Sequence, residues 1–207
     1  MDEDEKQYNR VFGSQFGLDV GCKSLIDAIR INTDSINELI MISDDTRHFM
    51  ELSWELLCRY ITDNTHLRII DLADCGLTDQ KIVFLFKALI SSSSIEEFDI
   101  RGNSFGIEGL RCMVPFLKNS PGLSKLHFDN NSKFDNYCFE LLVQTLYVSP
   151  IFEGLYFRKC NLTDISVLEI YTPSNLQYLG LDENAIGMEG CRTLADLLQR
   201  EEPNWNT

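Results

Sequence analysis

Basic side chains are scarce in this chain of 207 residues. Eighteen lysines and arginines stand against 32 aspartates and glutamates, so the formal net charge is −14. A surface of that charge repels a phosphate backbone, which argues against nucleic acid as a partner. The chain opens with an acidic run at residues 1–5, the opposite of the basic start of a secretion signal.

Long apolar runs and catalytic motifs are also missing. No apolar stretch is long enough to cross a bilayer, which argues against a membrane protein. There is no glycine-rich phosphate loop, no Gly-x-Ser-x-Gly elbow and no His-Glu-x-x-His, and the seven cysteines form no Cys-x-x-Cys pair. We therefore expect no enzymatic activity and no bound metal or cofactor. Reduced thiols in the cytosol or the nucleus are the simplest account of the cysteines.

What the chain does contain is one recurring phrase of eleven residues. Its positions 1, 4, 6 and 11 are apolar and its position 9 is Asn or Cys. The phrase starts at Leu67, Ile95, Leu123, Phe152 and Leu176, and the copy at Leu123 reaches its last apolar residue one place late, at Phe134. Counting a weaker start at Ile36, successive copies are 31, 28, 28, 29 and 24 residues apart.

The segments between the phrases have apolar residues at helical spacing. Two such stripes are Leu110, Met113, Val114 and Leu117, and then Leu141, Leu142, Thr145 and Leu146. Phrase and spacing together are those of a leucine-rich repeat, and a step near 28 with a helix in each unit resembles the ribonuclease-inhibitor type. The motifs Asn-x-Phe-Gly-x-x-Gly at 103–109 and Asn-x-Ile-Gly-x-x-Gly at 184–190 are similar to this type too. That type includes ribonuclease inhibitor, the Ran GTPase-activating protein and the sensor regions of NOD-like receptors.

The resemblance implies an α/β fold, a horseshoe-shaped leucine-rich repeat solenoid with a parallel concave sheet and convex helices. We expect about six repeats plus a degenerate N-terminal one whose strand lies near residues 9–11. The strands are predicted at 38–41, 69–72, 97–100, 125–128, 154–157 and 178–181. One repeat domain spans 6–200, between an acidic tail at 1–5 and a C-terminal tail at 201–207, and the convex wall is predicted to be thin at 163–175.

Several residues have a structural role in this scheme. Cys75 and Cys160 occupy position 9, where we expect them to bond to backbone groups rather than to a metal or substrate. Trp54 and the apolar residues Leu126 and Leu179 are predicted to be buried in the core. The glycines at 106, 109, 187 and 190 are predicted to let the backbone turn tightly into the helix.

Strand residues between the apolar positions point to the concave face. Position 5 gives the row Ile40, Asp71, Asp99, His127, Tyr156 and Gly180. Position 7 gives Ile42, Ala73, Arg101, Asp129, Arg158 and Asp182, and position 3 gives Glu38, Ile69, Glu97, Lys125, Gly154 and Tyr178. We expect the partner-binding residues to be Asp71, Asp99, Arg101, His127, Tyr156, Arg158 and Tyr178, because these residue types dominate interfaces or would need a cation opposite them.

These rows predict a protein-interaction module whose concave sheet binds a partner protein with a basic patch. One alternative is a solvated face on which Arg101 pairs with Asp99 or Asp129 and nothing binds. A second is a GTPase regulator resembling the Ran GTPase-activating protein, with Asn130, Asn131 and Lys133 in a loop at the strand ends. A third is a fragment of a larger NOD-like-receptor-type sensor. The partner and the oligomeric state are not predicted by the sequence.

Overall fold

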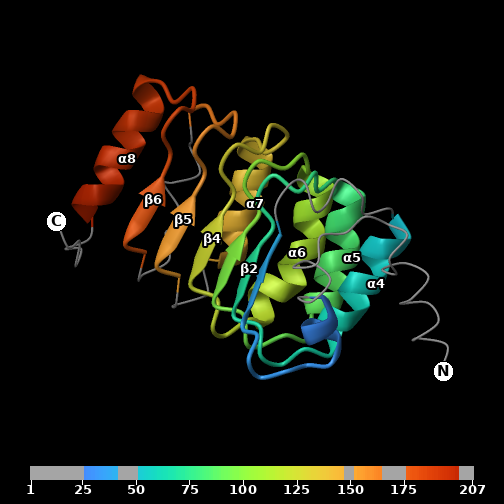
Figure 1. The fold of residues 1–207 in the computed structure, drawn as a ribbon. Helices are drawn as coiled ribbons and strands as arrows, with labels where there is room; N and C mark the ends of the chain where they lie inside the picture. The colour runs from blue at the N-terminus through green and yellow to red at the C-terminus, as the bar shows by residue number, and fades with distance from the viewer. Residues whose placement is uncertain (1–25, 42–50, 147–151, 165–175, 201–207) are drawn as a thin grey trace.

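The computed structural model describes residues 26–41, 51–146, 152–164 and 176–200. Within these residues, six short strands form one sheet with the order β1-β2-β3-β4-β5-β6, and every pair of neighbours is parallel (Figure 1). The strands are β1 Glu38–Ile40, β2 Ile69–Asp71, β3 Glu97–Asp99, β4 Lys125–His127, β5 Gly154–Tyr156 and β6 Tyr178–Gly180. All six begin at the predicted residue and end one residue earlier, so the predicted register is confirmed.

Helices alternate with the strands along the chain. They are α4 Glu51–Thr62, α5 Asp79–Leu89, α6 Ile107–Asn119, α7 Asn136–Leu146 and α8 Met188–Arg200. Helices α4 to α7 lie side by side along one side of the sheet, and α8 stands beyond β6 at the end of the array (Figure 1). The architecture is the predicted open α/β solenoid. The predicted strand at 9–11, the two tails and most of the segment at 163–175 lie outside the described residues.

The core lies between the strand layer and the helix layer. Inward positions of the inner repeats, such as Ile70, Phe98 and Phe128, are fully buried. Phenylalanine rings from strand and helix meet there, as where Phe86 of α5 lies 5.2 Å from Phe98. Trp54 is buried as predicted and its indole Nε1 donates to the Lys81 carbonyl oxygen at 2.9 Å. Burial of these large side chains is the main stabilising term of the array.

One predicted core residue departs from this scheme. Leu126 is buried as expected, but Leu179 of β6 is only partly buried. Leu179 is less buried because, among the described residues, β6 has only one neighbouring strand, β5. The prediction that Leu179 is fully buried was therefore wrong.

Position 9 forms the expected ladder of side-chain bonds to the backbone. The Asn103 Nδ2 donates to the carbonyl oxygens of Leu72 and Ile100, at 3.0 and 2.8 Å. The Cys160 thiol donates in the same way to the Phe128 carbonyl oxygen at 3.1 Å, and the Cys75 thiol to the Met41 carbonyl oxygen at 3.3 Å. These bonds satisfy carbonyl groups at the strand ends, which would otherwise be buried unpaired.

The paired glycines have a different role from the predicted one. Their backbone φ angles are not in the left-handed region, since Gly76 and Gly102 are the glycines that adopt it among the described residues. Instead, Asp79 Oδ1 accepts from the amides of Gly106 and Gly109, both at 2.8 Å. A Cβ at Gly109 would stand 3.0 Å from that oxygen. Glycine is therefore needed so that an aspartate at position 13 can cap the helix of the next repeat.

Candidate protein-binding surface

The concave rows are in the predicted register. Position 5 pairs Ile40 with Asp71, Asp71 with Asp99, Asp99 with His127 and so on to Gly180. Neighbouring parallel strands are about 4.8 Å apart, so residues in one row touch or nearly touch. The structure therefore brings five of the seven predicted residues into two groups, whereas Arg158 lies at the strand ends and Tyr178 on the edge strand β6.

The first group joins Asp71, Asp99 and Arg101. The Arg101 guanidinium forms a two-point ion pair with the Asp99 carboxylate. The distance from Nε to Oδ1 is 2.9 Å and that from Nη2 to Oδ2 is 2.7 Å. This pairing raises the pKa of Arg101, and the nearby carboxylate of Asp71 acts in the same direction. The negative charge of Asp99 is thus already met by a cation of the same chain, so the proximity of the two aspartates does not require a partner. The predicted pairing of Arg101 with Asp99 is confirmed.

The second group is aromatic. The His127 ring stacks on the Tyr156 ring with centroids 4.4 Å apart and planes within 3°. The Tyr156 ring also lies over Gly154 and beside Gly180, since a Cβ on these glycines would come within 2.9 and 3.3 Å of ring carbons. Because these two glycines have no side chains, they leave the space in which the Tyr156 ring packs against the sheet. The Tyr156 ring is therefore held in place by contacts within the sheet.

Glu97 of β3 contacts the aromatic group through His127 and also pairs with Lys125. Its two carboxylate oxygens lie 3.4 Å from the Lys125 Nζ and 3.2 Å from the His127 Nε2. The His127 contact is short but lacks the alignment of a hydrogen bond. Neither Glu97 nor Lys125 was predicted as a site residue, although both appear in the position 3 row.

Tyr178 begins the last strand and is 57% exposed. No ring contact involves it among the described residues. Its ring is therefore an exposed apolar surface on the strand next to that of Tyr156.

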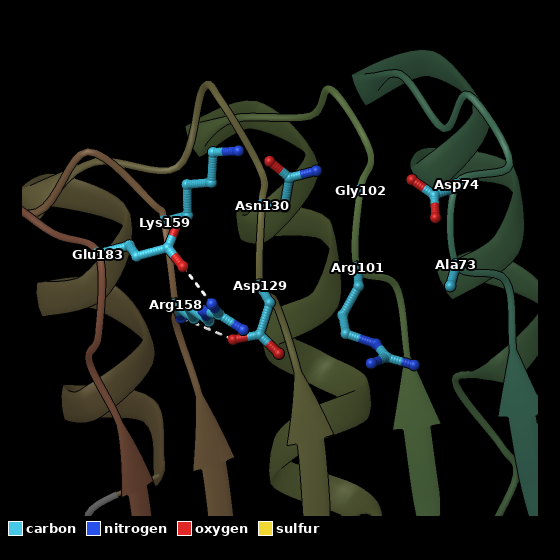
Figure 2. Close-up of a pocket in the computed structure, with 9 residues that line it drawn as sticks. All are labelled: Ala73, Asp74, Arg101, Gly102, Asp129, Asn130, Arg158, Lys159 and Glu183. Atoms are coloured by element: carbon cyan, nitrogen blue, oxygen red, sulfur yellow. Dashed lines mark hydrogen bonds and ion pairs between the residues drawn. The ribbon is translucent and has the colours of Figure 1, made fainter.

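The strand ends open into a hollow of about 530 Å3. Figure 2 shows its lining residues at the ends of β2 to β6, namely Ala73, Asp74, Arg101, Gly102, Asp129, Asn130, Arg158, Lys159 and Glu183. Arg158 pairs with Glu183, and its amide donates to Asp129 Oδ1 at 2.6 Å. Partial burial raises the pKa of Asp129 above its ordinary value.

Position 8 of each repeat is the feature that sequence reasoning missed. In the described repeats from β2 to β6, its residues have left-handed backbone, with φ between 54° and 65°; they are Asp74, Gly102, Asn130, Lys159 and Glu183. They line the hollow because this turn lifts them past the strand ends (Figure 2). Glycine and asparagine tolerate such backbone, so Gly102 and Asn130 could have indicated the left-handed turn at position 8 from the sequence.

One of the three loop residues considered for contact with a GTPase is not accessible. Asn131 is fully buried and its Nδ2 donates to the carbonyl oxygens of Ile100 and Phe128, at 3.0 and 2.7 Å. It belongs to the position 9 ladder and cannot contact a GTPase. Asn130 and Lys133 remain exposed.

The buried thiols lack catalytic character. Burial raises the pKa of Cys138 and Cys160 to about 11 and that of Cys58 to about 12. These thiols therefore stay protonated at neutral pH, whereas a nucleophilic cysteine needs a thiolate. Within the part of the chain that the structure describes, no three His, Cys, Asp or Glu side chains are arranged to hold a metal ion. None of the described helices could span a membrane.

Comparison with known proteins agrees with the geometry. The leucine-rich repeat family model matches residues 63–80. Ribonuclease inhibitor of Mus musculus is 22% identical over 215 residues, which cover 87% of this chain and 46% of that protein. The chain is a leucine-rich repeat protein of the ribonuclease-inhibitor-like type. NLR family CARD domain-containing protein 4 of Xenopus tropicalis is 28% identical over 173 residues, or 80% of this chain and 16% of that protein. This repeat protein thus spans less than half the length of either relative.

Solved structures show the same fold. The tropomodulin C-terminal domain of Caenorhabditis elegans superposes with a TM-score of 0.54 at 13% identity, covering 86% of this chain and 92% of that one. The leiomodin-1 actin-binding site 2 gives 0.53 at 14% identity, covering 86% and 87%. At these identities the likeness concerns the fold alone.

Proposed function

We propose that this repeat protein is a non-enzymatic interaction module whose concave sheet binds a basic patch on a partner protein. The support from relatives is general. Ribonuclease inhibitor is named for inhibiting another protein, and the leiomodin-1 domain is described as an actin-binding site. Neither relative indicates the partner of this chain.

The observation that carries the proposal is the unequal pairing of charges on the concave face. Its cations are tied to carboxylates of the same molecule, as in Arg101 with Asp99, Lys125 with Glu97 and Arg158 with Glu183. Among the described residues, Glu38 and Asp182 have no ion pair. The charge left over for a partner is therefore negative, which suits lysines and arginines on the partner.

The aromatic residues supply the apolar part of the proposed interface. Tyr156 is held by its stack on His127, and Tyr178 exposes its ring on the neighbouring strand. Rigid aromatic side chains near the centre of a contact commonly carry much of the binding energy. Acidic residues around such a centre would steer a basic partner and fix its register.

The test uses variants that change the concave face without disturbing internal pairs. Tyr178→Ala removes an exposed ring, and Glu38→Lys reverses an exposed, unpaired charge. Asp99 is unsuitable for this test, because reversing it would break its pair with Arg101. Matched controls are Tyr137→Ala on α7, whose ring is 74% exposed, and Lys87→Ala on α5.

A partner captured from lysate and then purified would be titrated against each variant by calorimetry. We expect Tyr178→Ala to weaken binding by about 1–3 kcal/mol. Glu38→Lys should slow association and flatten its dependence on salt. The controls should bind as the parent does. If Tyr137→Ala abolishes binding while both concave variants bind normally, the site lies on the helical side and the proposal is wrong.

A further inference from the structure

The row of side chains at position 5 is interrupted in one described strand. Position 5 carries a side chain in each strand from β1 to β5, and the row then reaches Gly180 of β6. A Cβ on Gly180 would meet Tyr156 first, since its three nearest atoms all belong to that residue, at 3.3–3.8 Å. Neighbouring strands are about 4.8 Å apart, so the glycine leaves a space about one side chain wide next to Tyr156. We call this space the Gly180 site.

The Tyr156 ring presents one of its two faces to the Gly180 site. Its other face is covered by the His127 ring, whose centroid lies 4.4 Å away and whose plane is within 3° of parallel. His127 is on β4 and Gly180 is on β6, on opposite sides of Tyr156 in the sheet. The face turned away from His127 is therefore turned toward Gly180. No second ring lies against this face among the described residues, which leaves it open to a planar group.

An exposed carboxylate follows Gly180 in the same repeat. Asp182 lies two residues later, at position 7, and forms no ion pair among the described residues. Positions 5 and 7 of one repeat are within reach of each other, because Arg101 at position 7 pairs with Asp99 at position 5. Arg158 of the neighbouring repeat pairs with Glu183, and Asp182 acts on it only through a smaller effect of its charge. A cation above Gly180 would therefore find a carboxylate within reach.

The group that suits the Gly180 site is both flat and positively charged. The face of an aromatic ring attracts a cation within about 6 Å of its centre, and a guanidinium can also stack on that face as a plane. Its N–H groups lie at the edge of the plane, where they can bond a carboxylate such as that of Asp182. A lysine ammonium has no plane to stack, and an apolar ring would leave Asp182 unpaired. Arginine is therefore the amino acid that uses every feature of the site.

We propose that an arginine of the partner protein enters the Gly180 site, stacks on the open face of Tyr156 and pairs with Asp182. This inference rests on the proposed function, because it names one residue of the basic patch and the place where the patch meets the sheet. His127, Tyr156 and the guanidinium would then form a row of three stacked planes. Tyr178, which lies two residues before Gly180 on the same face and is 57% exposed, would flank the apolar part of the arginine side chain.

The test is an NMR titration of the isotope-labelled full chain with three short peptides. In each peptide, blocked at both ends, glycines surround one central residue, which is arginine, lysine or phenylalanine. We expect the arginine peptide to bind most tightly and to shift the signals of the Gly180 amide and the Tyr156 ring. Gly180→Val fills the site and should weaken binding of the arginine peptide about tenfold. Asp182→Asn removes the charge and should weaken it about threefold, whereas Tyr156→Phe keeps the ring face and should bind as the parent does.

Glu38→Gln is the matched control, because it removes another exposed carboxylate without an ion pair, at the β1 end of the sheet. It should leave the affinity of the arginine peptide unchanged. Thermal unfolding of each variant checks that the chain is folded, and Asp182→Asn decides the question where Gly180→Val is not.

Three results would overturn the proposal. They are equal affinity for the arginine and lysine peptides, tighter binding of the phenylalanine peptide, and arginine-peptide binding that Gly180→Val and Asp182→Asn leave unchanged. Absence of arginine-peptide binding would overturn it too. If Tyr178→Ala still weakens binding of the captured partner in that case, the arginine site is wrong while the concave sheet remains the binding surface.

Discussion

The β4 and β6 repeats carry nearly the same phrase and yet differ in how deeply it is buried. Leu126 of β4 is 1% exposed, whereas Leu179 at the same position of β6 is only partly buried. Both side chains point inward, because the phrase fixes the direction of each residue. Their burial differs because a second repeat covers β4 and no described strand covers β6. In a solenoid, the direction in which a side chain points is set by its own repeat, whereas its burial also depends on the neighbouring repeat that covers it.

The largest expected effect comes from truncating the two leucines to alanine. Leu126→Ala should lower the free energy of unfolding by about 2–5 kcal/mol, because it leaves a cavity in a packed core. Leu179→Ala should cost clearly less, because its site is partly open to solvent already. Urea unfolding followed by circular dichroism measures both. Equal losses would mean that the two sites are equally buried in solution.

A smaller effect is expected from the aspartates that connect repeats. Asp79→Ala removes the cap on Gly106 and Gly109 of α6 and should cost about 0.5–2 kcal/mol. Asp164 makes the same contacts to Gly187 and Gly190, but its side chain is exposed. Asp164→Ala should therefore cost less. Thermal unfolding would show the difference, and Asp79→Asn, which keeps an acceptor oxygen, is the control.

The strands were predictable because the apolar period sets both their start and their face. The rows of concave residues followed from the same period. Pairing within those rows was less accessible to prediction. Arg101 could reach Asp99 or Asp129 from the pattern alone, and only the side-chain conformation decides for Asp99.

Two features could not be read from the phrase. The left-handed backbone of position 8 is shared by Lys159 and Glu183, whose residue types give little hint of it. The role of Gly109 depends on Asp79, which lies 30 residues earlier in the sequence. Such contacts arise between repeats, whereas the phrase describes one repeat at a time.

The smallest expected effect concerns position 7, where Asp129 of the inner array compares with the exposed Asp182. Burial raises the pKa of Asp129, so the folded protein binds this proton more tightly than the unfolded chain does. The ionised carboxylate therefore costs stability above its raised pKa, and protonation relieves that cost as pH falls through it. Asp129→Asn keeps an oxygen to accept from the Arg158 amide and should gain a few tenths of a kcal/mol at neutral pH, because solvent screens a half-exposed group. The gain should vanish in the acid range. Unfolding measured at several pH values would show this, with Asp182→Asn as the control, and a gain that grows as pH falls would contradict it.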